Sequence, residues 1–128
     1  MVLKVLLDTN FLLLPHQHKV DVFDEVERIV PESYDLVTLT PVLRELAHLA
    51  SQGGEDAVAA KIGLELLGRR NVRVIDAEGS ADDAIVKFAL ENKGNILVCT
   101  NDAGLKRRLN AAFVPLIVMR SKSHLVRL

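Results

Sequence analysis

Carboxylates recur in this sequence where predicted strands give way to predicted helices. Four consecutive strand-to-helix junctions carry at least one: Asp8, Glu45, Asp82 with Asp83, and Asp102. The carboxyl ends of parallel strands lie along one edge of an open sheet, where side chains from different strands meet in a crevice. We therefore expect these acids to lie together at that edge.

Such a group of acids suits a hard divalent cation, because the motifs that carry them contain no interleaved lysine or arginine. Mg²⁺ and Mn²⁺ prefer oxygen ligands and keep several waters, which leaves room for a phosphate. A bound metal lowers the pKa of a water, orients it towards phosphorus and stabilises charge on the departing oxygen. The residues therefore predict phosphodiester hydrolysis with Mg²⁺ or Mn²⁺ as cofactor.

The same acids also have structural explanations. A carboxylate near a helix start is favoured by the helix dipole, and Ser80 with Asp83 has the form of a capping box, so a structural role is favoured for Asp82 and Asp83 taken singly. Glu45 lies too deep in its helix to serve as a cap. Asp8 ends an apolar strand, where neighbouring acids would raise its pKa unless a cation offset the repulsion.

The elements that would position these acids alternate along the chain. Short apolar runs predict buried strands at 2–7, 36–39, 72–75, 96–99 and 114–119. Stripes at helical spacing lie between most of them, at 22–30, 42–50, 58–66, 85–89 and 105–109. This alternation predicts an α/β fold, a three-layer α/β/α sandwich with a central, mainly parallel sheet of about five strands, in a single domain over residues 1–128. Residues 121–128 fit a terminal strand, a partner-binding edge or a frayed tail equally well.

Composition favours one soluble core and limits the other classes. The chain has 128 residues, of which 49% are hydrophobic, and no stretch approaches the roughly 20 apolar residues of a membrane span. We expect a cytoplasmic protein that makes no contact with a membrane. The single cysteine, Cys99, rules out a disulfide framework and is expected to be buried and inert.

Charge is distributed unevenly. Residues 1–80 hold 13 acidic and 8 basic side chains, a net charge of −5, whereas residues 81–128 hold 4 acidic and 8 basic ones, a net charge of +4. The carboxyl-terminal third fits a face for phosphates and fits a solvated helix and tail equally well. Candidate phosphate contacts are Lys106, Arg107 and Arg108.

The four acidic motifs resemble those of the PIN-domain ribonuclease family. Asp8 in Leu-Leu-Asp-Thr-Asn, Glu45 in Thr-Pro-x-x-x-Glu-Leu, Asp83 in Asp-Asp-Ala-Ile-Val and Asp102 in Thr-Asn-Asp match, in order, the acidic positions of that family. The resemblance implies a PIN-like nuclease domain that depends on Mg²⁺ or Mn²⁺ and cuts single-stranded RNA endonucleolytically. It assigns these four residues to the metal and to catalysis.

The resemblance also implies supporting residues and partners. Asp82 takes a supporting or second-metal role, beside Asn10, Thr100 and Asn101. The doubled Asp-Asp leans towards the branch that processes ribosomal RNA, and the alternative is a toxin with the same chemistry. The expected partners are single-stranded RNA, a second copy in a homodimer, and an antitoxin or a ribosome-assembly protein.

Histidines and rival functions complete the sequence-based expectations. His16 and His18 beside Pro15 are predicted to be loop residues, because no third zinc ligand is near, and His48 is assigned a surface or packing role. An aspartyl-phosphate enzyme of the dehalogenase type would have aspartate where this chain has Asn10. A receiver domain would carry an acidic pair beside the first strand. A non-catalytic RNA-binding or assembly module and a flap-nuclease relative that cuts DNA stay open.

Overall fold

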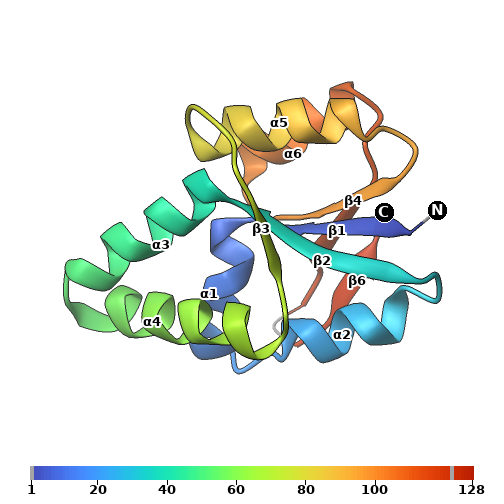
Figure 1. Ribbon diagram of the computed structural model, residues 1–128. Helices are drawn as coiled ribbons and strands as arrows, with labels where there is room; N and C mark the ends of the chain where they lie inside the picture. Colours follow the sequence, from blue (N-terminus) through green and yellow to red (C-terminus); the bar gives the residue numbers. More distant parts are fainter. Residues whose placement is uncertain (1, 122) are drawn as a thin grey trace.

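A six-stranded sheet forms the centre of the protein. The computed structural model describes residues 2–121 and 123–128. The strand order is β3-β2-β1-β4-β5-β6, with β1 to β5 parallel and β6 antiparallel (Figure 1). The strands are β1 (Leu3–Leu7), β2 (Tyr34–Leu39), β3 (Arg73–Ile75), β4 (Ile96–Cys99), β5 (Leu116–Met119) and β6 (Leu125–Arg127). The predicted mainly parallel sheet is confirmed, with one strand more than expected.

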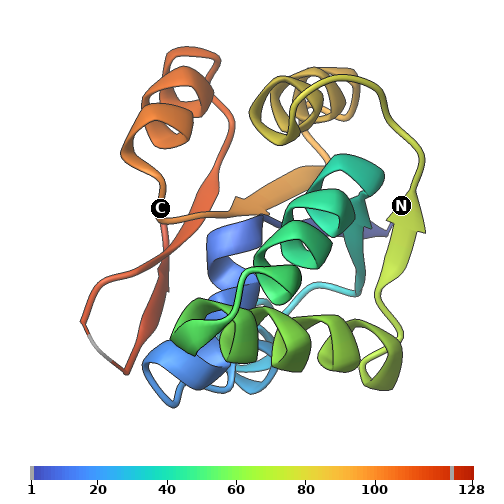
Figure 2. The same ribbon diagram turned by 90° about the vertical axis from the view of Figure 1, so that its left-hand side faces the viewer.

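Helices cover both faces of this sheet, so the predicted three-layer sandwich is confirmed. Helices α5 and α6 lie on one face and α1, α2 and α4 on the other, while α3 packs against both α4 and α5 at one end of the sheet (Figures 1 and 2). The helices are α1 (Thr9–Gln17), α2 (Val22–Ile29), α3 (Thr40–Ser51), α4 (Gly54–Arg69), α5 (Ala81–Glu91) and α6 (Ala103–Ala111). None of them, in the part of the chain that is described, is long and apolar enough to cross a bilayer.

The segment after β1 differs from the sequence-based expectation. It was predicted to be a loop around His16 and His18, and it is the helix α1 with Pro15 inside it. Proline lacks an N–H and its ring crowds the preceding turn, which is why the pattern indicated a break. Phe11 and Leu12 are fully buried, so tertiary packing outweighs the cost of the proline.

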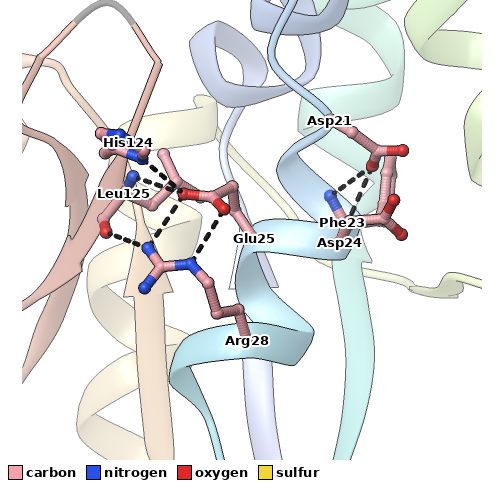
Figure 3. A network of polar contacts seen from close by, with 7 residues as sticks. All are labelled: Asp21, Phe23, Asp24, Glu25, Arg28, His124 and Leu125. Atoms are coloured by element: carbon pink, nitrogen blue, oxygen red, sulfur yellow. Dashed lines mark hydrogen bonds and ion pairs between the residues drawn. The ribbon is translucent and has the colours of Figure 1, made fainter.

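Residues 125–127 settle one of the alternatives left open for the tail, since they form the edge strand β6. Val126 pairs with Val118 of β5, and Leu125 is buried. Two side chains of α2 bond to the backbone of Leu125 on the side of β6 away from β5. Glu25 accepts a hydrogen bond from the N–H of Leu125 at 3.1 Å, and Arg28 donates one to its carbonyl at 3.3 Å (Figure 3). These contacts cover part of an edge that would otherwise be free to pair with another chain.

The burial of Cys99 agrees with its predicted inert role. The thiol lies in β4 with no exposed surface. Burial raises the pKa of Cys99 far above its usual value, so the thiol stays protonated at neutral pH.

Helices α1 and α4 approach closely at Gly63. A Cβ placed on this glycine would lie 2.6 Å from the backbone oxygen of Leu12, a fixed part of α1. Gly68, in the same helix, has open space around it. The contact at Gly63 brings α4 against α1, the helix that Asp8 caps.

We predict that Gly63→Ala lowers the free energy of unfolding by about 1 to 2 kcal/mol, because crowding against backbone outweighs the helix propensity that alanine adds. Gly68→Ala adds the propensity alone and should raise the free energy of unfolding by at most about 1 kcal/mol. Urea unfolding of the two variants measures the difference. A stabilised Gly63→Ala protein would contradict the close approach.

Candidate active site

The site lies where the strand order reverses. The chain passes from β1 to β2 and β3 on one side, and β4 and β5 continue the sheet on the other side of β1. Ligands of open α/β sheets bind beyond the carboxyl ends of strands at such a point. A hollow of about 280 Å³ occurs there, lined by Asp8, Thr9, Asn10, Leu13, Glu45, Asp82 and Asp102.

Asp8 is the most deeply placed acid of this hollow. Its side chain follows β1 and only 4% of the residue is exposed. One carboxylate oxygen accepts a hydrogen bond from the N–H of Thr9 at 2.7 Å, and the other accepts one from the hydroxyl of Thr100 at 2.7 Å. Burial raises the pKa of Asp8 to about 6, the charges of Asp82 and Glu45 add to the rise, and the two hydrogen bonds oppose it.

Thr100 links two of the acids. It is fully buried after β4, donates its hydroxyl proton to Asp8, and accepts a hydrogen bond from the N–H of Asp102 at 3.1 Å. Asp102 caps α6 by accepting a hydrogen bond from the N–H of Leu105 at 2.7 Å. Asp102 therefore has both roles considered for it from the sequence, because its side chain caps the helix and also lines the hollow.

Glu45 reaches the hollow from α3. It lies in the second turn of that helix and is exposed, and the hydroxyl of Thr9 donates a hydrogen bond to its carboxylate. Thr9 was missed as a site residue, although its position directly after Asp8 in Leu-Leu-Asp-Thr-Asn was a signal. Its hydroxyl joins the start of α1 to α3.

Asp82 and Asp83 take places different from those expected. Asp82 lines the hollow, whereas the side chain of Asp83 is 70% exposed and forms an ion pair with Arg108 at 2.9 Å. Ser80 caps α5 by accepting a hydrogen bond from the N–H of Asp83 at 3.2 Å. Successive helical residues point in directions about 100° apart, which is how Asp82 lines the hollow while Asp83 beside it does not. Asp83, which the sequence assigned to the metal, therefore lies outside the hollow, and Asp82 is the residue of this pair that lines it.

Electrostatic coupling identifies the same group of acids. Burial raises the pKa of Asp82, the charges of Asp102 and Glu45 raise it further, Arg108 opposes the rise, and Asp83 adds the smallest contribution. Asp82 and Glu45 in turn act on Asp8. We name Asp8, Glu45, Asp82 and Asp102 the acid cluster.

Asn10 and Asn101 hold the rim of the hollow. The side-chain oxygen of Asn10 accepts a hydrogen bond from the N–H of Asn101 at 3.1 Å, and that of Asn101 accepts one from the N–H of Met119 at 2.9 Å. These bonds fasten the segment after β4 to α1 and to β5. Asn10 lines the hollow, and Asn101 is not among its lining residues.

The predicted phosphate contacts lie outside the hollow, on α6. Arg107 and Arg108 are exposed and Lys106 is half-buried. Arg108 is engaged with Asp83. The helix begins at Asp102, so its basic side chains start within one turn of the acid cluster.

The donors of the acid cluster suit a hydrated Mg²⁺ or Mn²⁺. All of them are oxygens, and within residues 2–121 and 123–128 no three acidic, histidine or cysteine side chains converge closely enough to enclose an ion directly. Mg²⁺ is usually held by one or two carboxylates with several waters, so a spread set of acids around an open hollow fits it. Burial raises the pKa values of Asp8 and Asp82, neighbouring carboxylates raise them further, and a cation would offset both effects.

This combination of a parallel sheet, a reversal of strand order and acids at that point defines a class of α/β proteins with a cation-binding crevice. A family model described as a PIN-like domain matches residues 5–122, so the chain belongs to that family. Ribonuclease VapC4 of Methanocaldococcus jannaschii is 33% identical over 125 residues, which cover 94% of this chain and 93% of that protein. The structure of the PIN domain endonuclease Utp24 matches with a TM-score of 0.77 at 26% identity, over 98% of this chain and 92% of that one. The family resemblance and the fold inferred from the sequence are thereby confirmed.

We predict that Asp8→Asn stabilises the metal-free protein. With a pKa of about 6 in the folded state against 3.8 when unperturbed, ionised Asp8 opposes folding by at most about 3 kcal/mol above pH 6, and protonated Asp8 does not oppose it below pH 4. Asparagine carries no charge at either pH. Thermal unfolding in chelator should therefore show a gain for the variant at neutral pH that shrinks as pH falls from about 6 to about 4. A variant destabilised at neutral pH would show that the carboxylate serves the fold.

Proposed function

We propose that this chain is a divalent-metal-dependent endoribonuclease that hydrolyses phosphodiester bonds of single-stranded RNA, with Mg²⁺ or Mn²⁺ as cofactor. The observation that carries the proposal is the acid cluster, four carboxylates from four chain segments around one hollow at the switch point of the sheet. The names of the two relatives, a ribonuclease and an endonuclease, support the same chemistry.

The acid cluster would hold the cation. The charges of Asp82 and Glu45 act on Asp8, and those of Asp102 and Glu45 act on Asp82. When bound, the cation supplies a water of lowered pKa for attack on phosphorus and stabilises the departing oxygen. Thr100 and Thr9 keep Asp8 ionised and aimed by their hydrogen bonds, which lower its pKa against burial. Thr9 and Glu45 fix the position of α3 relative to this group.

Basic side chains on α6 would contact the phosphates on either side of the scissile one. Arg107 is exposed, Lys106 before it is half-buried, and Arg108 directly after it is exposed. The ion pair of Arg108 with Asp83 also places a positive charge near Asp82. Contacts of this kind give affinity without sequence preference.

The biological role has two candidates with the same chemistry. The doubled Asp82-Asp83 is the basis for RNA processing, and the similarity to Ribonuclease VapC4 supports the toxin of a toxin–antitoxin pair. The similarity to VapC4 weakens the preference for ribosomal RNA processing that the doubled Asp82-Asp83 suggested. We retain a homodimer, an antitoxin and a ribosome-assembly protein as proposed partners, and the cytoplasm as the proposed location.

We predict that labelled single-stranded RNA is cut with Mg²⁺ or Mn²⁺ and left intact in chelator. Asp82→Asn should slow cutting by at least about a hundredfold, the scale expected when a metal ligand is lost. Asp83→Asn is the matched control, because it removes the neighbouring carboxylate of the same helix, and it should slow cutting by less than about threefold. Initial rates under identical conditions make the comparison.

Two results would contradict the proposal. Equal losses of cutting rate in Asp82→Asn and Asp83→Asn would contradict the claim that the acid lining the hollow matters more than the exposed acid beside it. Cutting that persists in chelator, or that is absent with both metals although RNA is bound, would favour a different chemistry or an assembly module.

We also predict that Arg107→Ala weakens the binding of single-stranded RNA and reduces the slope of log affinity against log salt by about 0.7, the value for one lost phosphate contact. Arg69→Ala serves as control, because Arg69 is an exposed arginine at the end of α4 that is paired with Glu65. Fluorescence anisotropy over a salt series gives both slopes. An unchanged slope for Arg107→Ala would place the RNA elsewhere.

A further inference from the structure

A second hollow adjoins the acid cluster. It has a volume of about 330 Å³ and is lined by Thr9, Glu45, His48 and Leu49. Thr9 and Glu45 line the first hollow as well, so their hydrogen-bonded side chains form a wall common to both. A group bound in one hollow is therefore next to a group bound in the other.

The two hollows differ in chemistry. The first is lined mainly by polar atoms and carries the carboxylates of the acid cluster, whereas the second is lined almost wholly by apolar atoms. Phosphate needs the cation of the first hollow to offset the carboxylates. A flat group with apolar faces needs no cation, and its transfer from water into the second hollow is favourable because apolar surface is buried.

Helix α3 places the side chains of the second hollow in a row. His48 and Leu49 follow Glu45 by three and four residues, the spacing that puts side chains on one face of a helix. His48 is exposed and offers a planar ring, and Leu49 is half-buried beside it. Among the residues that line this hollow, His48 is the one with an aromatic ring.

We propose that the hollow of His48 and Leu49 binds the base of the nucleotide next to the scissile phosphate. The inference rests on the proposed function, since the phosphate is placed at the acid cluster. In single-stranded RNA an unpaired base can turn away from the backbone and stack on an aromatic side chain, including histidine. His48 then acts as a residue for substrate binding and selectivity, in contrast to the surface or packing role expected from the sequence, and it takes no part in proton transfer.

The test compares ligands with and without a base, using the full chain with Mg²⁺. Nucleoside 5′-monophosphates and ribose 5-phosphate share the phosphate and the sugar, so the ratio of their Kd values isolates the base. For wild type we expect roughly tenfold tighter binding of at least one nucleoside monophosphate, the scale of one base stacked on one ring. The imidazole signals of His48 should shift with the monophosphate and stay in place with ribose 5-phosphate.

Three variants complete the design. His48→Ala should remove the preference for the base, and His48→Phe should retain it because the flat ring is kept. His18→Ala is the matched control, an exposed histidine at the end of α1 outside both hollows, and it should leave the preference unchanged. Thermal unfolding of each variant checks that the fold is intact.

Equal binding of the monophosphates and ribose 5-phosphate by wild type would overturn the inference, and so would a preference that survives in His48→Ala. Neither result depends on cleavage. Metal-dependent cutting of RNA without a preference for the base would leave the proposed function standing and remove only the base hollow. A preference for the base without any cutting would support the hollow and count against the nuclease.

Discussion

The buried carboxylate of Asp8 is the constraint on which the rest of the site depends. Asp8 follows β1 and is buried, so its charge is largely withdrawn from water, and burial raises its pKa to about 6. Two hydrogen bonds, from Thr9 and Thr100, recover part of that cost. The remainder is stabilisation that a cation can supply, so the metal-free fold carries an electrostatic strain that metal binding would relieve.

The fold concentrates this strain by its strand order. Reversal at β1 and β4 brings Asp8 and Thr100 side by side, and the following helix caps itself with Asp102, so one short segment supplies both a support and an acid. Helices α3 and α5 add Glu45 and Asp82 from the far side. Asp102 can therefore cap α6 and belong to the acid cluster at the same time. The positive end of the helix dipole at this N-terminus also stabilises negative charge at the site.

Most of the fold and part of the site could be predicted from the sequence. The strands follow from apolar runs, because a doubly covered parallel sheet buries both faces of each strand. Helix α1 could not be predicted, because Pro15 signals a break that only tertiary packing outweighs. The choice between Asp82 and Asp83 depends on the rotation of α5 about its axis, which the adjacent acids do not specify and which the ion pair of Asp83 with Arg108 reveals.

The most direct measurement is the binding of Mn²⁺ to the protein without RNA, followed by electron paramagnetic resonance of the free ion. Wild type and Asp8→Asn are compared at a pH above 6, where Asp8 is ionised. The acid cluster, as described, requires saturable binding by wild type and its loss, or a weakening by at least about tenfold, in the variant. Equal binding by both proteins, or no binding by wild type, would contradict the role of Asp8 as the centre of a cation site.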